Sequence, residues 1–150
     1  MNLMLFLHVT SVVVWVGGMF FAYMALRPAA ASVLEPPQRL ALWSGVFGKF
    51  FPWVWLSVVL ILLSGLDMLV RIGGVAAPHY VLTMLVLGVA MMLIFAHVFF
   101  APTKKLKRAV GQQDWNAGGA ALAQIRKLIG INLILGLVTI AVVFGGRALG

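Results

Sequence analysis

The sequence predicts an all-α integral membrane protein, a four-helix bundle formed by one domain over residues 1–150. Hydrophobic residues make up 63% of the chain and charged residues 9%, whereas soluble domains carry about 25% charged residues. Four apolar segments, at about 3–26, 51–72, 79–101 and 128–147, approach the roughly 20 residues that a membrane-spanning helix needs. None of them alternates apolar and polar residues strictly, which argues against the strands of a membrane β-barrel.

The first apolar segment, 3–26, is predicted to be a retained membrane helix. The small residues of the following RPAAAS motif resemble a signal-peptidase site. However, no Lys or Arg precedes the segment, and it is longer than the ~7 to 15 apolar residues of a secretory signal.

The stretch between the first two spans predicts a short amphipathic helix at the membrane interface. Pro36 can open a helix, and large apolar residues then recur at helical spacing, at Leu40, Trp43, Phe47 and Phe50. Pro52, followed by Trp53, begins the second span in the aromatic belt of the bilayer.

The distribution of basic residues predicts the orientation. All Lys and Arg residues except Arg71 and Arg147 fall in loops 27–50 and 102–127 or at their edges. The positive-inside rule makes these loops cytoplasmic and places both termini outside. We expect the protein in a bacterial cytoplasmic (inner) membrane, with the lipid bilayer as its main partner. The net charge of +8 is then explained by the membrane topology, because most of the basic residues lie in the cytoplasmic loops. A nucleic-acid partner is excluded on this basis.

Polar residues within the spans fall at two depths. At ~1.5 Å per residue, His8, Asp67 and His79 form an outer layer, whereas His97 and Asn132 lie near the inner side. His8 and His97 differ in depth by roughly 20 Å. They cannot bind one metal ion jointly, so two sites are needed if both are ligands.

Two interpretations of the outer layer are open. In one, His8 and His79 bind a metal or haem iron, and Asp67 fixes the imidazole tautomer. In the other, His79 is solvated, His8 bonds to a hydroxyl and Asp67 pairs with Arg71. An imidazole within a membrane span is costly, which makes His8 and His97 candidate ligands.

Other residues could contribute to a cofactor site, although packing is the commoner role for each type. Trp15 could form a wall, and Gly18 permits the approach of a helix or a flat macrocycle. Thioethers suit the cuprous ion. The methionines nearest the outer layer are Met1, Met4 and Met68, whereas Met84, Met91 and Met92 have the spacing of packing residues.

Several kinds of chemistry are excluded by composition. The chain has no cysteine, which removes disulfides, thiolate metal sites and iron–sulfur clusters. Only three acidic residues are present, and no hydrolase motif occurs. Chemistry on a bound cofactor or passage of an ion is easier to accommodate.

The motif LHVTSVVVWVGG around His8 resembles the first helix of CopD-like membrane proteins and of HemJ-type protoporphyrinogen oxidases. The four-span plan and the basic PTKKLKR stretch after the third span are similar too. HemJ proteins imply haem b at His8, whereas CopD proteins imply copper. The HemJ-type lysine behind the histidine that opens the third helix is missing, since Tyr80, Val81 and Leu82 follow His79.

Three hypotheses follow from this resemblance and from the residues. The first is a haem b-binding protein in electron transfer or tetrapyrrole handling; if it is an enzyme, it would be a haem-dependent membrane oxidoreductase with a quinone or another redox partner. The second is copper binding or transport through His8, His79 and outer methionines. The third is a structural membrane subunit without cofactor. Formation of a homodimer is left open.

Overall fold

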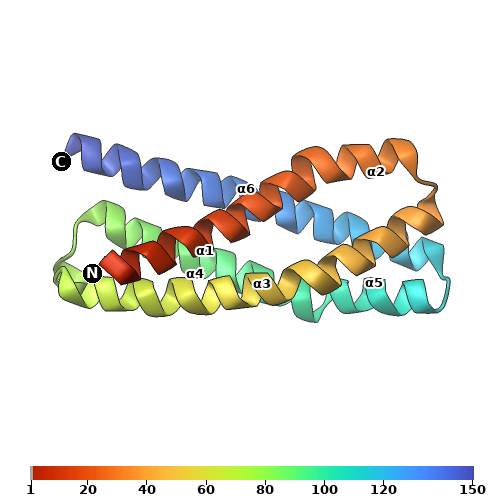
Figure 1. The fold of residues 1–150 in the computed structure, drawn as a ribbon, viewed down its shortest axis with the longest axis horizontal. Helices are drawn as coiled ribbons and strands as arrows, with labels where there is room; N and C mark the ends of the chain where they lie inside the picture. The colour runs from red at the N-terminus through yellow and green to blue at the C-terminus, as the bar shows by residue number, and fades with distance from the viewer. Residues whose placement is uncertain (1) are drawn as a thin grey trace.

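The computed structural model describes residues 2–150, and this range is helical almost throughout and contains no strand. The chain forms four long helical rods, and each rod runs antiparallel to the one before it (Figure 1). The rods are Asn2–Val33, Pro36–Arg71, His79–Gly111 and Trp115–Leu149, and each is long and apolar enough to cross a membrane. The predicted all-α, four-helix integral membrane fold is therefore confirmed.

Two rods are divided into shorter elements and two are single helices. The first rod comprises α1 (Asn2–Phe21), the π-helix η1 (Ala22–Leu26) and α2 (Arg27–Val33). The second is α3 (Pro36–Arg71), which the short 3₁₀ helix η2 (Gly74–Ala76) follows. The third comprises α4 (His79–Phe100) and α5 (Pro102–Gly111), and the fourth is α6 (Trp115–Leu149).

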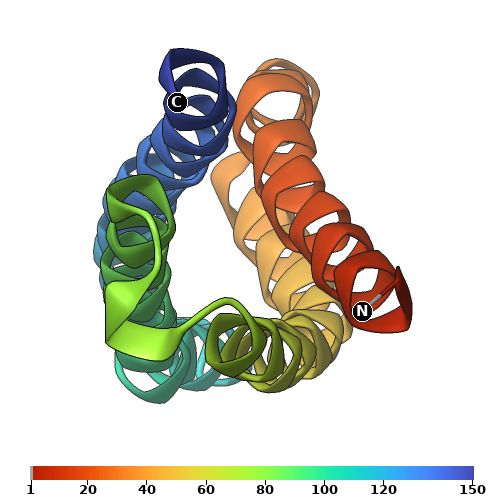
Figure 2. The same cartoon turned by 90° about the vertical axis from the view of Figure 1, so that its left-hand side faces the viewer.

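The two ends of the bundle differ in charge. Both termini and the α3–α4 connection lie at one end, which we call the terminal end, and the α2–α3 and α5–α6 connections lie at the other (Figure 1). We call the second end the basic end, because its half of the bundle carries all Lys and Arg residues except Arg71 and Arg147. The end-on view in Figure 2 shows the rods arranged around a central axis, with α1 beside α3 and α4 beside α6. Which end faces the cytoplasm stays a prediction.

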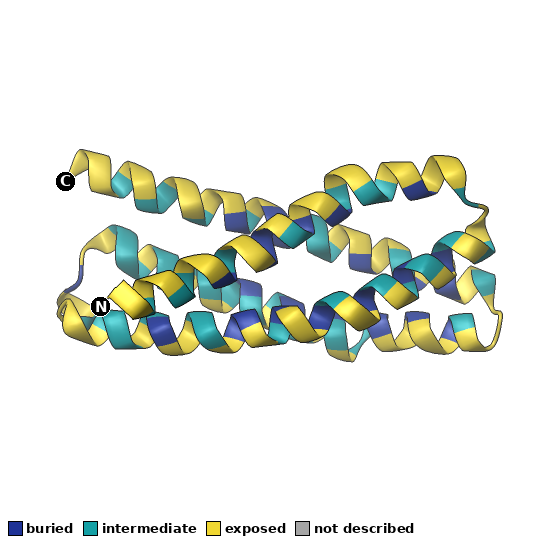
Figure 3. Cartoon of the chain, viewed as in Figure 1, coloured by how far each residue is buried: buried dark blue, intermediate teal, exposed yellow. Residues whose placement is uncertain are grey.

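The outer surface of the bundle is apolar in the half toward the terminal end. Figure 3 shows that the outward faces of the helices are exposed. They carry large apolar side chains from every rod, for example Phe6 (63% exposed), Leu63 (63%), Leu93 (67%) and Phe144 (67%). Such a surface is stable only against lipid, which agrees with the predicted spans.

Aromatic side chains fill the middle of the bundle. Phe51 stacks on Phe47 with ring centroids 4.9 Å apart and meets Phe95 edge-on at 5.3 Å. Trp15 also packs edge-on against Phe95, at 6.2 Å. These four residues, all buried, are called the aromatic cluster below. Edge-to-face and offset pairs of this kind add stability beyond the burial of their area.

The expected amphipathic segment is helical, but it is not a separate interfacial helix. It forms the first part of α3, which continues through Pro52 without a break. Pro52 cannot donate the main-chain hydrogen bond to residue 48. The helix nevertheless continues, because Phe47 and Phe51 on either side of this point pack into the same aromatic cluster, and membrane helices tolerate internal proline.

The π-helix η1 is explained by Pro28. The proline ring would clash with the carbonyl four residues earlier in a regular α-helix. The turn before it is wider, and the Arg27 N–H bonds to the Ala22 carbonyl five residues back. The Tyr23 carbonyl lies five residues before Pro28, which has no N–H, and it accepts a hydrogen bond from Arg27 Nε instead, at 3.1 Å.

Candidate functional site

A large apolar cavity lies between α1, α3, α4 and α6 in the half of the bundle toward the terminal end. Its volume is about 430 Å³. Each of the four helices contributes aliphatic side chains to its wall, for example Val12, Ile61, Leu85 and Ile140. The polar side chains that line it are His8, Thr139 and Arg147. Because the Thr139 hydroxyl already donates to the Leu135 carbonyl, at 2.7 Å, His8 is the candidate ligand on this wall.

The position of the His8 ring is set by α3. His8 Nδ1 lies 3.1 Å from the Ser64 hydroxyl oxygen. Gly65, the next residue, provides the room for this contact, because a Cβ built there would be 3.1 Å from His8 Cε1. Ser64 is itself buried. The α1–α3 contact therefore holds the imidazole at the cavity wall.

The hydrogen bonds of Ser64 assign the His8 tautomer. The Ser64 hydroxyl donates its single proton to the Leu60 carbonyl. It can therefore only accept from His8, which places the imidazole hydrogen on Nδ1. The lone pair of Nε2 is then available. A histidine whose other nitrogen is held by a hydrogen bond is the usual arrangement of a metal ligand.

Three methionines of α4 share the cavity with His8. Met84, Met91 and Met92 all line it. Their spacing in the sequence is typical of packing residues, and Met91 does pack closely, since its Cε lies 3.2 Å from the Cβ position of Gly136. The sequence pattern alone could not show that these three residues line the same cavity as His8.

His79, His97 and Asp67 are not among the residues that line this cavity. His79 is exposed at the first residue of α4, and His97 is exposed near the end of the same helix. Asp67 accepts a hydrogen bond from Arg71 Nε at 2.8 Å and forms an ion pair with it on the surface of α3. Within residues 2–150, no three His, Asp or Glu side chains are grouped closely enough to hold a metal ion.

The other sequence-predicted site residues contribute to packing. Trp15 lines the cavity and belongs to the aromatic cluster. A Cβ at Gly18 would overlap the Phe50 ring, so this glycine permits close contact between α1 and α3. Asn132 is buried on α6, and its Nδ2 donates to the Met91 carbonyl of α4 at 3.1 Å. Asn132 thus fixes the helix that carries the methionines.

Sequence reasoning missed Ser64 as the partner of His8, although a bond from His8 to some hydroxyl was one of the two interpretations. Serine is common in membrane helices, and nothing in its local pattern distinguishes Ser64 from Ser57 on the same helix. The signal that could have found it is depth, because Ser64 precedes Asp67 by less than one turn and Asp67 was placed level with His8.

Comparison with protein-family models matches residues 44–145 to the family described as copper resistance protein D, CopD. The match covers most of α3 and extends into α6, and the LHVTSVVVWVGG motif with His8 precedes it. Comparisons with curated proteins and with solved structures find no match. More than half of the chain fits the family model, so the chain belongs to the CopD family.

Proposed function

We propose that this protein handles copper in the membrane and binds a cuprous ion in the apolar cavity through His8 and the methionines of α4. The observation that carries the proposal is that His8, Met84, Met91 and Met92 line one cavity. Family membership points to copper as well. Copper was the second of the sequence-based hypotheses and is now the first.

The donor set suits the cuprous ion better than a harder cation. Thioether and imidazole groups are soft or borderline ligands, which favour the monovalent copper ion over magnesium or calcium. None of these ligands carries charge, and the acids Glu35, Asp67 and Asp114 do not line the cavity. A monovalent cation in an apolar space therefore depends on direct coordination, since hydration is largely lost there.

The aromatic cluster limits how the ion would move. It lies between the cavity and a second pocket near the basic end, because Trp15 lines the cavity and Phe47 lines that pocket. Three arginines line the second pocket and repel a cation, whereas the cavity has a single arginine, Arg147, on its wall toward the terminal end. We therefore propose that copper enters and leaves the cavity from the terminal end, which the positive-inside rule places outside the cell.

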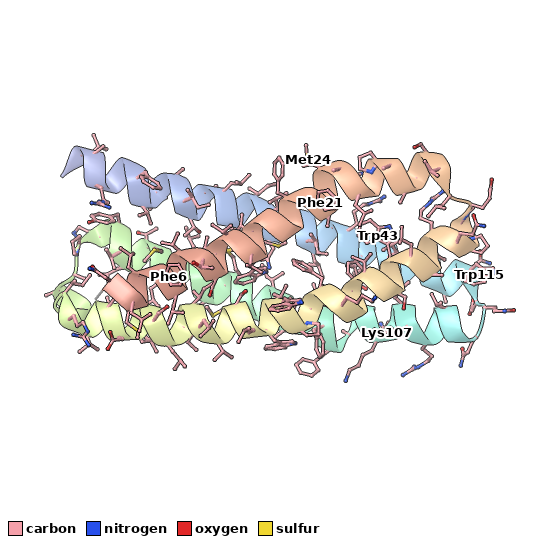
Figure 4. All side chains as sticks on the ribbon, in the orientation of Figure 1. Phe6, Phe21, Met24, Trp43, Lys107 and Trp115 are labelled. Carbon is pink, nitrogen blue, oxygen red and sulfur yellow. The ribbon has the colours of Figure 1, made fainter. Side chains whose placement is uncertain are left out.

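The proposal is tested by titrating the detergent-purified protein with cuprous ion. A chromophoric cuprous chelator competes for the ion and reports the affinity of the protein. His8→Ala should weaken binding by at least about tenfold, as expected for loss of one metal ligand in a site of few ligands. Met84→Leu and Met92→Leu should each weaken it less. His97→Ala and Met24→Leu are the matched controls, since His97 is exposed and Met24 lies on the outer surface of η1 (Figure 4).

Two results would contradict the copper site. One is the absence of stoichiometric cuprous binding by the wild-type protein. The other is an equal loss of affinity in the cavity variants and in the two control variants, which would indicate general damage to the bundle.

Binding of haem b in electron transfer or tetrapyrrole handling is the second candidate, and the imidazole on an apolar wall favours it. An apolar space of about 430 Å³ with one imidazole on its wall has the character of a haem pocket. His8 would be the axial ligand, and Arg147 could pair with a propionate. An absorption spectrum of the purified protein distinguishes haem from copper. A Soret band that weakens in the His8→Ala variant favours haem, whereas a colourless protein that binds copper excludes haem. A protein that binds neither would be a structural subunit.

A further inference from the structure

The pocket near the basic end differs in chemistry from the copper cavity. It encloses about 230 Å³ between η1, α2, the first turns of α3 and the first turns of α6. Its charged lining residues are Arg27, Arg39 and Arg126, one from each of the three rods that meet there. Below them, Leu40 and Phe47 contribute an apolar floor. We call this space the arginine pocket.

The charge of the arginine pocket is not neutralised within the described chain. The salt bridge found within residues 2–150 is Asp67–Arg71, at the opposite end of the bundle. Glu35, the nearest acid in sequence, accepts from the main chain of Gln38 in a capping box at the start of α3. Three arginines therefore line one pocket without a carboxylate partner among residues 2–150.

Backbone contacts hold two of these arginines in place. Arg39 Nη2 donates to the Leu34 carbonyl at 3.2 Å, while its Nε is buried and has no partner among residues 2–150. Arg27 donates to the Tyr23 carbonyl, and its guanidinium lies 4.5 Å from the centre of the Tyr23 ring. The π-helix created by Pro28 leaves this carbonyl available. The site is thus preorganised, with donor groups left over for an anion.

The composition of the pocket points to a phosphate attached to an apolar group. Guanidinium groups bind phosphate oxygens through paired, charge-assisted hydrogen bonds. Trp43 lines the pocket from the buried core, and the partly exposed Trp115 lines it at the first residue of α6. Figure 4 labels both residues, and an exposed tryptophan such as Trp115 favours the headgroup region of a bilayer. Basic pockets between membrane helices on the side with excess Lys and Arg bind anionic lipid headgroups.

We propose that the arginine pocket binds the phosphate of an anionic phospholipid, whose acyl chains extend along the apolar surface of the bundle. A volume of about 230 Å³ holds a phosphate and its glycerol unit and excludes the whole lipid. The proposal is independent of the copper site, which lies on the other side of the aromatic cluster.

Native mass spectrometry of the delipidated protein, titrated with short-chain phosphatidylglycerol, tests this site. Arg126→Gln and Arg39→Gln should each weaken binding by roughly tenfold, the equivalent of one charge-assisted hydrogen bond. Arg108→Gln is the matched control, because Arg108 is exposed on α5 and does not line the pocket. Arg126 is exposed, so its replacement leaves the fold intact even if that of Arg39 does not.

The outcomes separate the source of the phosphate. Binding of phosphatidylglycerol that is sensitive to Arg126 and is not displaced by inorganic phosphate supports the lipid site. Competitive binding of inorganic phosphate with similar affinity assigns the pocket to a free phosphate and overturns the lipid proposal. Equal weakening by Arg126→Gln and Arg108→Gln shows that general surface charge is responsible, and no weakening by either shows that the lipid binds elsewhere; both results overturn the site itself.

Discussion

The His8 imidazole and the Ser64 hydroxyl lie 3.1 Å apart and join α1 to α3 at the wall of the apolar cavity. Ser64→Ala should weaken cuprous binding by roughly 10- to 100-fold, the usual effect of losing the hydrogen-bond partner of a metal-binding histidine. The chelator titration measures this. Ser57→Ala, seven residues earlier and also buried on α3, is the control and should bind copper like the wild type.

Two adjacent glycines of α1 provide a matched test of helix packing. A Cβ at Gly18 would overlap the Phe50 ring, whereas one at Gly17 has no neighbour within 4 Å. Gly18→Ala should therefore destabilise the protein by about 1–3 kcal/mol through overpacking. Gly17→Ala should be neutral or slightly stabilising, because alanine favours the helix. Thermal unfolding in detergent measures both; equal stability of the two variants would contradict the close α1–α3 contact.

The Asp67–Arg71 ion pair should contribute little to stability or to copper binding. The Arg71 and Asp67 side chains are 55% and 37% exposed, and water and salt screen exposed ion pairs so strongly that they add little to stability. Asp67→Asn should leave the unfolding temperature and the cuprous affinity close to wild type. A loss of copper affinity in this variant would instead indicate that Asp67 belongs to the metal site, as one interpretation of the sequence proposes.

Asn132 should stabilise the packing of α6 on α4. Its Nδ2 donates to the Met91 carbonyl, and hydrogen bonds between membrane helices contribute about 0.6–1.7 kcal/mol. Asn132→Leu should lower the free energy of unfolding by this order, as measured by denaturant titration in mixed micelles. Ile134→Ala, on the exposed face of the same helix, is the control and should have a smaller effect.

The sequence predicted the four spans because each is a long apolar run, and lipid as solvent leaves few alternatives to a helix. It also indicated His8, because an imidazole within such a run stands out. The role of Met84, Met91 and Met92 could not be predicted, since helical spacing does not tell which face meets a cavity. Ser64 could not be predicted either, because its role depends on the contact between α1 and α3.

The continuity of α3 was missed for a related reason. The sequence predicts that a span begins at Pro52, since proline usually begins a helix or ends the one before it. Whether a helix continues through proline depends on the packing on both sides, here that of Phe47 and Phe51, and this is not visible in a local pattern.

The length of α3 makes the molecule taller than the bilayer. Its 36 residues span about 54 Å at 1.5 Å per residue, whereas the hydrocarbon core is about 30 Å thick. Roughly 20 Å of the same helix must therefore stand in the headgroup region and the water beyond it. Pro52, where a helix bends most easily, separates that projecting part from the part of α3 that carries Ser64.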